Sequence, residues 1–336
     1  MTVNMRVTVL GAGSWGTALA VLLHKNGHKV KLWSHEEEQI IPIVKEHENK
    51  RFLPGITIPE VIGCTADLFE AVKGVKAIVL AVPSQAVRSV AANLKGKVDD
   101  NVILINVAKG FENGTLMRMS EVIREELPFN TVTVLSGPSH AEEVALGLPT
   151  TVVATAYNPD MAEWTQDLFI NDDFRVYTND DMLGVEVAGA LKNIIALGCG
   201  ISAGLGLGDN SQAAILIRGL AEIIRLGKAM GAKEATFGGL AGIGDLVVTC
   251  GSKHSRNRRA GIMLGEGKSL DYVLEHMGMV VEGVSATQNG YALAKKYKVD
   301  MPITEGIYHI LYDGVEPKAA MRELMTRTKT GEHIPR

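Results

Sequence analysis

Near its N-terminus the chain reads Arg6-Val7-Thr8-Val9-Leu10-Gly11-Ala12-Gly13-Ser14-Trp15-Gly16. The first five of these residues are mostly apolar and alternate, which predicts a buried β-strand. The last six match the pattern G-x-G-x-x-G, and apolar residues at helical spacing follow as far as residue 25. A second apolar run at residues 30–33 completes the strand, turn, helix and strand that are typical of a dinucleotide-binding βαβ unit.

The three glycines of this motif have separate physical roles. Gly11 permits the tight turn, Gly13 lets a pyrophosphate approach the backbone, and Gly16 lets the helix pack on the strand. The N-terminus of the helix adds free N–H groups and a partial positive charge, both of which favour phosphate. We therefore predict a dinucleotide site at this turn; the alternative is an ordinary tight turn without a ligand.

The residues after the second strand bear on which dinucleotide binds. A site for NAD usually carries a carboxylate at the end of that strand, where it accepts a hydrogen bond from the ribose 2′-OH. Here Ser34 and His35 follow the strand; they leave room for a 2′-phosphate and can bond to it. Glu36, Glu37 and Glu38 favour NAD instead, although they also suit the acidic first turn of a helix. The sequence favours NADP(H), with NAD(H) also accepted.

Short apolar runs continue through the first half of the chain and alternate with helical stretches. They occupy residues 77–82, 102–107, 131–135 and 150–154. Strands that alternate with helices imply crossover connections and a mostly parallel sheet, and such connections are almost always right-handed. The first half is therefore predicted to be a Rossmann-type, doubly wound α/β domain.

From about Gly184 onward the pattern is helical. Apolar residues at helical spacing occupy residues 185–203, 211–230, 269–277, 285–297 and 303–311. We predict an NAD(P)-binding α/β domain over residues 1–183 and an all-α domain over residues 184–336. A length of 336 residues suits this division, since one domain ordinarily holds about 100–200 residues.

The composition is that of a packed globular protein, with 46% hydrophobic and 21% charged residues. The net charge of −4 supplies no basic field for nucleic acid or an acidic membrane surface. Three scattered cysteines without a CxxC pair argue against a disulfide framework or a zinc site and suit a reducing compartment. The most apolar stretch, residues 185–207, contains charged residues and indicates a buried helix rather than a membrane anchor. Without a signal-peptide pattern, we expect a cytoplasmic protein.

One lysine in the second half has unusual surroundings. Lys192 lies within residues 188–195, a stretch that is otherwise apolar on nearly every face. A surface lysine would extend its ammonium group to water. This helix offers no evident wet side, however, and a partly desolvated lysine with a lowered pKa suits proton transfer. Asn193 beside it is either a surface amide or a substrate ligand.

Two further segments of the second half carry polar groups suited to ligands. Asp245 ends the glycine-rich segment 239–244, where it either caps the following helix or pairs with Lys192 and bonds a substrate hydroxyl. Ser255, Arg256 and Asn257 follow within a basic run. Such a run is usually a solvated face, but a hydroxyl, a guanidinium and an amide at a helix start suit a phosphate.

Two loops of the first half lie where doubly wound sheets bind ligands, beyond the carboxyl ends of strands. One is residues 106–110, which include Lys109, and the other is residues 137–141. The alternative for Lys109 is an exposed loop lysine. His35 and His140 have no partner at the spacing of metal ligands, so we assign no metal site.

In this combination and order, the segments resemble NAD(P)-dependent glycerol-3-phosphate dehydrogenases of the bacterial type. The matching stretches are residues 11–16, 108–110, 136–139, 189–193, 206–210, 239–245 and 254–257. The resemblance implies reversible reduction of dihydroxyacetone phosphate to sn-glycerol 3-phosphate, a step that supplies phospholipid synthesis. It also implies a homodimer without metal, in which the helical domain serves substrate binding and dimerisation. This chain departs from the family at His140, where an aromatic ring is frequent, and at residues 106–108, where a small or hydroxyl-bearing residue often precedes the lysine.

The resemblance also assigns roles to individual residues. Lys192 becomes the catalytic proton donor and acceptor. Substrate contacts fall on Lys109, Gly137, Ser139, Lys192, Asp245, Ser255, Arg256 and Asn257. Cofactor contacts, beyond the glycines Gly11, Gly13 and Gly16, fall on Ser14, Trp15, His35, Lys109, Ala141, Arg256, Val280 and Glu282.

Two other functions stay open at this point. A related two-domain dehydrogenase for another hydroxy acid or sugar derivative would share Lys192 and Asn193, but it would have no use for the phosphate-binding residues 255–257. A dinucleotide-binding redox sensor without turnover would need no buried lysine near its cofactor.

Overall fold

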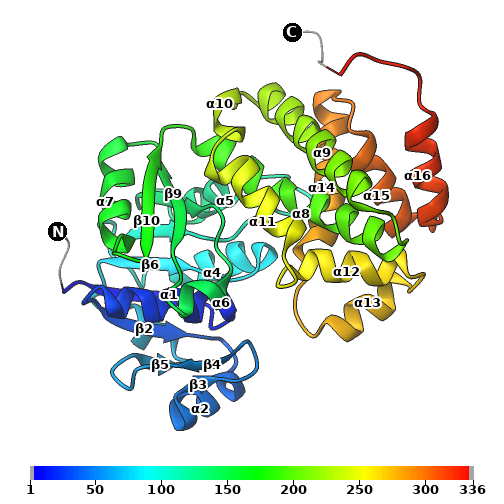
Figure 1. The fold of residues 1–336 in the computed structure, drawn as a ribbon. Coiled ribbons are helices and arrows are strands. Elements are labelled where there is room, and N and C mark those ends of the chain that lie inside the picture. Colours follow the sequence, from blue (N-terminus) through cyan, green and yellow to red (C-terminus); the bar gives the residue numbers. More distant parts are fainter. Residues whose placement is uncertain (1–3, 333–336) are drawn as a thin grey trace.

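The computed structural model describes residues 4–332, and its first part is built on an eight-stranded sheet with the order β10-β9-β8-β7-β6-β1-β2-β5 (Figure 1). The strands are β1 (Arg6–Leu10), β2 (Lys29–Trp33), β5 (Gly63–Thr65), β6 (Ala77–Leu80), β7 (Ile103–Asn106), β8 (Val132–Ser136), β9 (Thr150–Ala156) and β10 (Phe174–Asn179). Neighbouring strands are parallel except β8 and β9, which are antiparallel.

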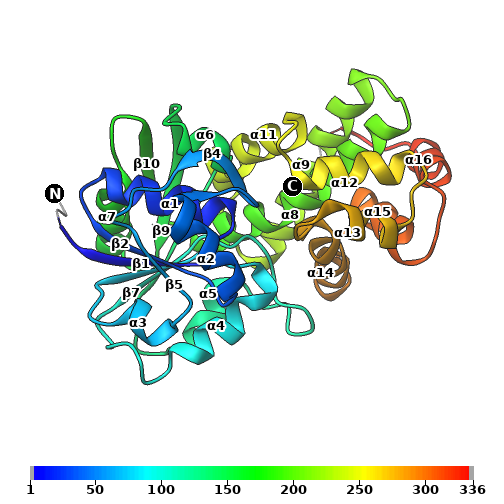
Figure 2. The same ribbon diagram turned by 90° about the horizontal axis from the view of Figure 1, so that it is seen from below.

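Helices cover both faces of this sheet (Figure 2). One face carries α1 (Ser14–Lys25), α2 (Glu37–Glu46), α6 (Ala141–Ala145) and α7 (Pro159–Phe169), and the other carries α3 (Leu68–Val72), α4 (Val87–Leu94) and α5 (Met119–Glu126). Successive side chains of a strand point to opposite faces, so in β6 Val79 joins one apolar cluster while Ile78 and Leu80 join the other. The prediction of a doubly wound α/β domain is confirmed.

Some strands of this part were not predicted. The short strands β3 (Glu48–Asn49) and β4 (Leu53–Thr57) form an antiparallel hairpin beside α2, and most of its residues are polar or exposed, so no apolar alternation marks it. Strand β10 lies at the edge of the sheet, where alternate side chains face water.

The second part of the chain is helical, which confirms the predicted all-α region. Its central helix is α8 (Met182–Gly204), and the others are α9 (Asp209–Met230), α10 (Glu234–Phe237), α11 (Asp245–Gly251), α12 (Arg256–Gly265), α13 (Leu270–Met277), α14 (Glu282–Tyr297), α15 (Pro302–Tyr312) and α16 (Pro317–Thr326). Helix α8 is long and apolar enough to cross a membrane, but 94% of its most apolar window is buried inside the protein, as in a core helix. The change from sheet to helices falls between β10 and α8; the domain limits 1–183 and 184–336 stay a prediction.

Helices α8 and α12 approach each other through glycines. A Cβ on Gly200 would lie 2.1 Å from the carbonyl oxygen of Arg258, and Gly204 and Gly265 meet in the same way one turn further on. The two backbones are therefore in direct contact, without side chains between them. This contact fixes the position of α12, and with it the segment that precedes the helix, relative to α8.

Candidate active site

The glycine turn has the geometry that its sequence predicts. Gly11 has a φ of 113°, in the region that favours glycine, and a Cβ on Gly16 would lie 1.8 Å from the carbonyl oxygen of Gly11. A Cβ on Gly13, by contrast, would meet nothing within 4 Å. No side chain caps α1, which begins at Ser14, so its first N–H groups are available to a ligand. These residues fit the pyrophosphate of a dinucleotide.

The segment after β2 differs in part from expectation. Ser34, expected beside a 2′-phosphate, is buried and donates to the side-chain oxygen of Gln39 at 2.7 Å. The side chain of His35 is exposed, at 77%, and lies 3.8 Å from the Glu36 carboxylate. Glu37 and Glu38 occupy the acidic first turn of α2, which was the structural alternative for them.

Three charged side chains converge at the junction of the two parts. Lys192 of α8 donates to Oδ1 of Asp245 at 2.8 Å, and Lys109 donates to Oδ2 of the same carboxylate at 2.6 Å. Lys192 and Asp245 are 6% and 1% exposed. The pairing expected between them is therefore present, and Asp245 is not a helix cap: it begins α11 while its carboxylate binds the lysines.

Burial and the neighbouring charges shift the pKa values of this cluster. Burial lowers the pKa of the Lys192 ammonium group to about 8; Lys109 adds to the decrease, and Asp245 opposes it. Burial also opposes ionisation of Asp245, but the two lysines outweigh it and hold the pKa of the carboxyl below its usual value. The cluster thus keeps a carboxylate ionised while its partner Lys192 gives up a proton more readily than a surface lysine.

Thr249 is a member of this cluster that was not predicted. It lies one turn after Asp245 in α11, and its hydroxyl accepts a hydrogen bond from Lys192 at 2.6 Å. The same hydroxyl donates to the carbonyl oxygen of Asp245. The i, i+4 spacing from Asp245 to Thr249 is the sequence signal that could have found it.

The loop after β8 contributes backbone atoms to the same place. The carbonyl oxygen of Gly137 accepts from Lys109 at 3.0 Å and from the Ser139 hydroxyl at 2.9 Å. Gly189 of α8 makes room for this arrangement, since a Cβ there would lie 3.1 Å from the Ser136 hydroxyl. Ala141 follows at the start of α6. Lys109, Gly137, Ser139, Lys192 and Asp245 are therefore brought together as expected.

His140, the departure from the family pattern, lies beside this cluster. Its Nε2 atom is buried without a hydrogen-bond partner, and its ring lies 5.9 Å from that of His254. Burial lowers the pKa of His140, and the nearby Lys192 charge lowers it further. Both effects favour the neutral form of the imidazole.

The start of α12 brings together the residues predicted to hold a phosphate. Ser255 is the N-cap and accepts from the N–H of Arg258 at 3.2 Å. The amide of Asn257 is already engaged: it donates to the Asn193 side chain at 2.9 Å and accepts from the N–H of Gly283 at 2.8 Å. Asn257 therefore joins α8, α12 and the start of α14.

Two predicted cofactor residues lie near the start of α14. The Glu282 carboxylate accepts from the N–H of Ser84 at 3.0 Å and from its hydroxyl at 2.6 Å, which ties the helical part to the segment after β6. Arg256 donates to the carbonyl oxygen of Val280 at 3.3 Å. Ser84 is a second participant that was not predicted, because its partner lies far away in the sequence.

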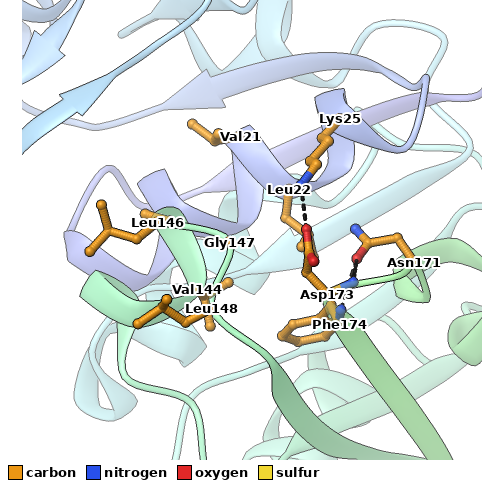
Figure 3. A pocket seen from close by; sticks show the side chains of 11 residues that line it. Val21, Leu22, Lys25, Val144, Leu146, Gly147, Leu148, Asn171, Asp173 and Phe174 are labelled. Atoms are coloured by element: carbon orange, nitrogen blue, oxygen red, sulfur yellow. Dashed lines mark hydrogen bonds and ion pairs between the residues drawn. The ribbon is translucent and has the colours of Figure 1, made fainter.

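A surface cavity of 110 Å³ lies elsewhere, at the end of α1 opposite the glycine turn (Figure 3). Val21, Lys25 and Phe174 line it, and Lys25 pairs with Asp173 at 2.5 Å. None of the predicted site residues contributes to it. In residues 4–332 no cluster of metal-ligating side chains is large enough to hold an ion.

Comparison with known proteins gives a consistent result. The N-terminal model of NAD-dependent glycerol-3-phosphate dehydrogenase matches residues 6–162, and the C-terminal model matches residues 181–322. The glycerol-3-phosphate dehydrogenases [NAD(P)+] of Geobacillus thermodenitrificans and Bacillus pumilus are 56% and 52% identical; each alignment covers 97% of this chain and 96% of the relative. The crystal structure of the Coxiella burnetii glycerol-3-phosphate dehydrogenase is 41% identical, with a TM-score of 0.93 over 96% of this chain and 99% of that one. The chain belongs to the NAD-dependent glycerol-3-phosphate dehydrogenase family.

Proposed function

We propose that this protein reduces dihydroxyacetone phosphate reversibly to sn-glycerol 3-phosphate with NAD(P)H. The observation that carries the proposal is the buried cluster of Lys192, Lys109 and Asp245. The cluster supplies a buried proton donor with a lowered pKa. The same chain has a dinucleotide turn and a helix N-terminus suited to phosphate. The product is the glycerol backbone of phospholipids, so the enzyme supplies their synthesis, and we place it in the cytoplasm.

The ketone oxygen is where the protein acts during reduction. When bound, the nicotinamide ring supplies the hydride that reduces the ketone carbon, and negative charge grows on the oxygen. Lys192 donates a proton to this oxygen from Nζ, and its pKa of about 8 leaves it largely protonated at pH 7. In the reverse direction the neutral amine accepts the proton. Such general acid–base catalysis contributes about 10²–10⁴-fold.

Lys109 and Asp245 set the conditions for that proton transfer. The Lys109 ammonium group adds positive potential where charge develops. Asp245 binds both lysines through separate oxygens and so positions the Lys192 amine. Thr249 restrains the same amine from a second side. Because most of the cluster is shielded from water, these electrostatic effects are stronger than they would be at the surface.

The phosphate of the substrate is assigned to the start of α12. This helix of 10 residues directs its first N–H groups at the ligand, and Arg256 supplies a guanidinium suited to phosphate. Ser255 adds a hydroxyl, and Asn257 holds the segment in place through Asn193. Binding energy at the phosphate orients the ketone carbon for reaction.

The cofactor is assigned to the glycine turn and to residues from both parts of the chain. Gly11, Gly13, Ser14, Trp15 and Gly16 hold the pyrophosphate; the open space at Gly13 and the uncapped start of α1 support this. His35 lies at the adenosine ribose, and Lys109, Ala141, Arg256, Val280 and Glu282 complete the site. We expect NADP(H) to be preferred and NAD(H) to be accepted.

A homodimer is the assembly we propose. Helix α9 exposes Ala213, Ala214 and Ile217 along one side, and Ile217 is 50% exposed. An apolar helix face of this kind is suited to contact with a second copy. Light scattering coupled to size-exclusion chromatography tests this; a monomer mass would contradict it.

One assay tests reaction, substrate and cofactor together. Oxidation of NADPH and of NADH is followed separately at 340 nm with dihydroxyacetone phosphate as the substrate. We expect turnover with both cofactors and a higher kcat/KM with NADPH. Dihydroxyacetone without phosphate is the control and should react far more slowly. Absence of turnover with either cofactor would contradict the proposed function.

A further inference from the structure

Two exposed charged side chains lie next to the end of β2, where Rossmann-type domains distinguish their cofactors. Arg51 comes from the loop of the β3–β4 hairpin, and its Nη1 atom lies 3.5 Å from the Glu36 carboxylate. The side chains are 64% and 46% exposed, so both remain accessible. His35 approaches the other oxygen of Glu36. Neither Arg51 nor Glu36 takes part in the site described above.

The hairpin and the start of α2 are anchored to the glycine turn at a single atom. The carbonyl oxygen of Ala12, between Gly11 and Gly13, accepts from the buried Asn49 of β3 at 2.8 Å. It also accepts from the side chain of Gln39 in α2. Arg51 follows Asn49 by two residues, and Glu36 precedes Gln39 by three. The backbone segments that carry both charged groups are therefore anchored beside the dinucleotide turn.

The opposite charges of this pair suit two alternative ligands. A carboxylate near the end of β2 accepts a hydrogen bond from a ribose 2′-OH, whereas a nearby arginine accommodates a 2′-phosphate. A 2′-phosphate would be repelled by Glu36 and attracted by Arg51, which binds phosphate through several N–H groups. At a surface site the existing ion pair is weak, so a phosphate can replace the carboxylate as the partner of Arg51.

We propose that Arg51 and Glu36 together determine cofactor choice: Arg51 binds the 2′-phosphate of NADP(H), and Glu36 binds the ribose 2′-OH of NAD(H). The inference rests on the proposed binding of a nicotinamide dinucleotide at the glycine turn. It explains how one site accepts both cofactors. The exposed ion pair separates when Arg51 binds the 2′-phosphate of NADP(H), and it remains formed when NAD(H) binds. Arg51 is held in reach by its own neighbour, since its guanidinium stacks 4.8 Å above the Phe52 ring.

Calorimetric titration of the full-length protein with NADPH and with NADH, in the absence of substrate, tests this directly. The two ligands differ only in the 2′-phosphate. Arg51→Ala should raise the Kd for NADPH about ten- to fiftyfold, the usual effect of losing hydrogen bonds to a charged group. Its Kd for NADH should change less than about twofold. Glu36→Gln should act in the opposite sense, with tighter NADPH and weaker NADH binding.

Lys50 provides a matched control, since it is adjacent to Arg51, carries the same charge and is also 64% exposed. It pairs with Glu46 at 2.7 Å rather than with Glu36. Lys50→Ala should leave both dissociation constants within about twofold. An equal loss of NADPH affinity in Lys50→Ala and Arg51→Ala would overturn the inference, because a diffuse positive field would then explain the effect.

The inference and the proposed function fail in different ways. If the unaltered protein bound neither dinucleotide, the proposed function would fail and the inference with it. If it bound both, and Arg51→Ala weakened them equally or not at all, the inference alone would be overturned. If it bound NADH more tightly than NADPH while Arg51→Ala still weakened NADPH selectively, the inference would stand and the expected preference for NADP(H) would be wrong.

Discussion

The glycine turn and the lysine cluster are built in opposite ways. The turn uses backbone atoms of consecutive residues, Gly11 to Gly16: the missing side chains of Gly11 and Gly16 allow close packing, and that of Gly13 leaves space for a ligand. The cluster uses charged and hydroxyl side chains that come from α8, α11 and the loop after β7. The turn is therefore sensitive to added volume, whereas the cluster is sensitive to a change of charge. Substitutions that separate these two sensitivities test the comparison.

The largest effect is expected at Lys192. Lys192→Ala removes the proposed proton donor and should lower kcat by about 10³-fold, while the Kd for NADPH stays within about threefold because the glycine turn is untouched. Stopped-flow turnover and a fluorescence titration with NADPH measure the two quantities. Near-normal turnover in this variant would show that the cluster is not catalytic.

The glycine turn offers a paired test of added volume. Gly16→Ala places a methyl group against the Gly11 carbonyl; it should cost about 2–4 kcal/mol of stability and weaken NADPH binding about 100-fold. Gly13→Ala meets nothing in the protein, so its Tm should be unchanged while NADPH binding still weakens. Equal melting temperatures for the two variants in differential scanning calorimetry would contradict this account of the turn.

A third prediction concerns the phosphate end of the substrate. Arg256→Ala should raise the KM for dihydroxyacetone phosphate about ten- to fiftyfold, because a charge-assisted contact is lost. Arg259 of the same helix is exposed and supplies the control, since Arg259→Ala removes the same charge from a residue that is not assigned to the phosphate. An unchanged KM in Arg256→Ala would show that the substrate phosphate does not bind at this position.

The pH profile tests the charge sensitivity of the cluster without any substitution. If Lys192 is the proton donor that we propose, reduction requires its protonated form, so kcat should be constant below the pKa of about 8 and fall about tenfold per pH unit above it. Because Lys109 lowers the pKa of Lys192, Lys109→Ala should move the decline to higher pH in addition to lowering kcat. A decline that moves to lower pH would reverse the assigned influence of Lys109.

The smallest effect is expected where the two parts of the chain are tied together. Ser84→Ala removes the hydroxyl that donates to Glu282 and should raise the KM for NADPH about three- to fivefold, the consequence of about 1 kcal/mol. The kcat should stay nearly constant because the lysine cluster is intact. A loss of kcat as large as that of Lys192→Ala would mean that this contact controls the cluster itself.

The same contrast explains how much the sequence could predict. Strand β1 and helix α1 have the predicted bounds, because all the groups that form the turn are contiguous. The pair of Lys192 and Asp245 was also within reach, since a lysine in an apolar helix requires a counter-charge. The role of each residue in binding and catalysis stays a prediction.

Contacts between distant segments could not be predicted. Ser84 and Glu282 are separated by 198 positions, and no local pattern links them. Ser34 was expected to face a phosphate, but its burial depends on how α2 folds back over β2. The amide of Asn257 was expected at the ligand, and its bonds to Asn193 and to the start of α14 depend on the packing of three helices.

The glycine contact between α8 and α12 has a consequence for which substrates react. Lys192 lies eight residues before Gly200, about 12 Å along α8, and Ser255 immediately precedes α12. Because the two backbones touch, no side chain can repack to lengthen or shorten the span between the proposed proton donor and the proposed phosphate position. The number of bonds between the phosphorus atom and the carbonyl carbon then determines which ketone phosphates can react. A ketone phosphate with one extra methylene would still bind by its phosphate, yet its carbonyl would miss the lysine, so it would behave as a competitive inhibitor rather than a slow substrate.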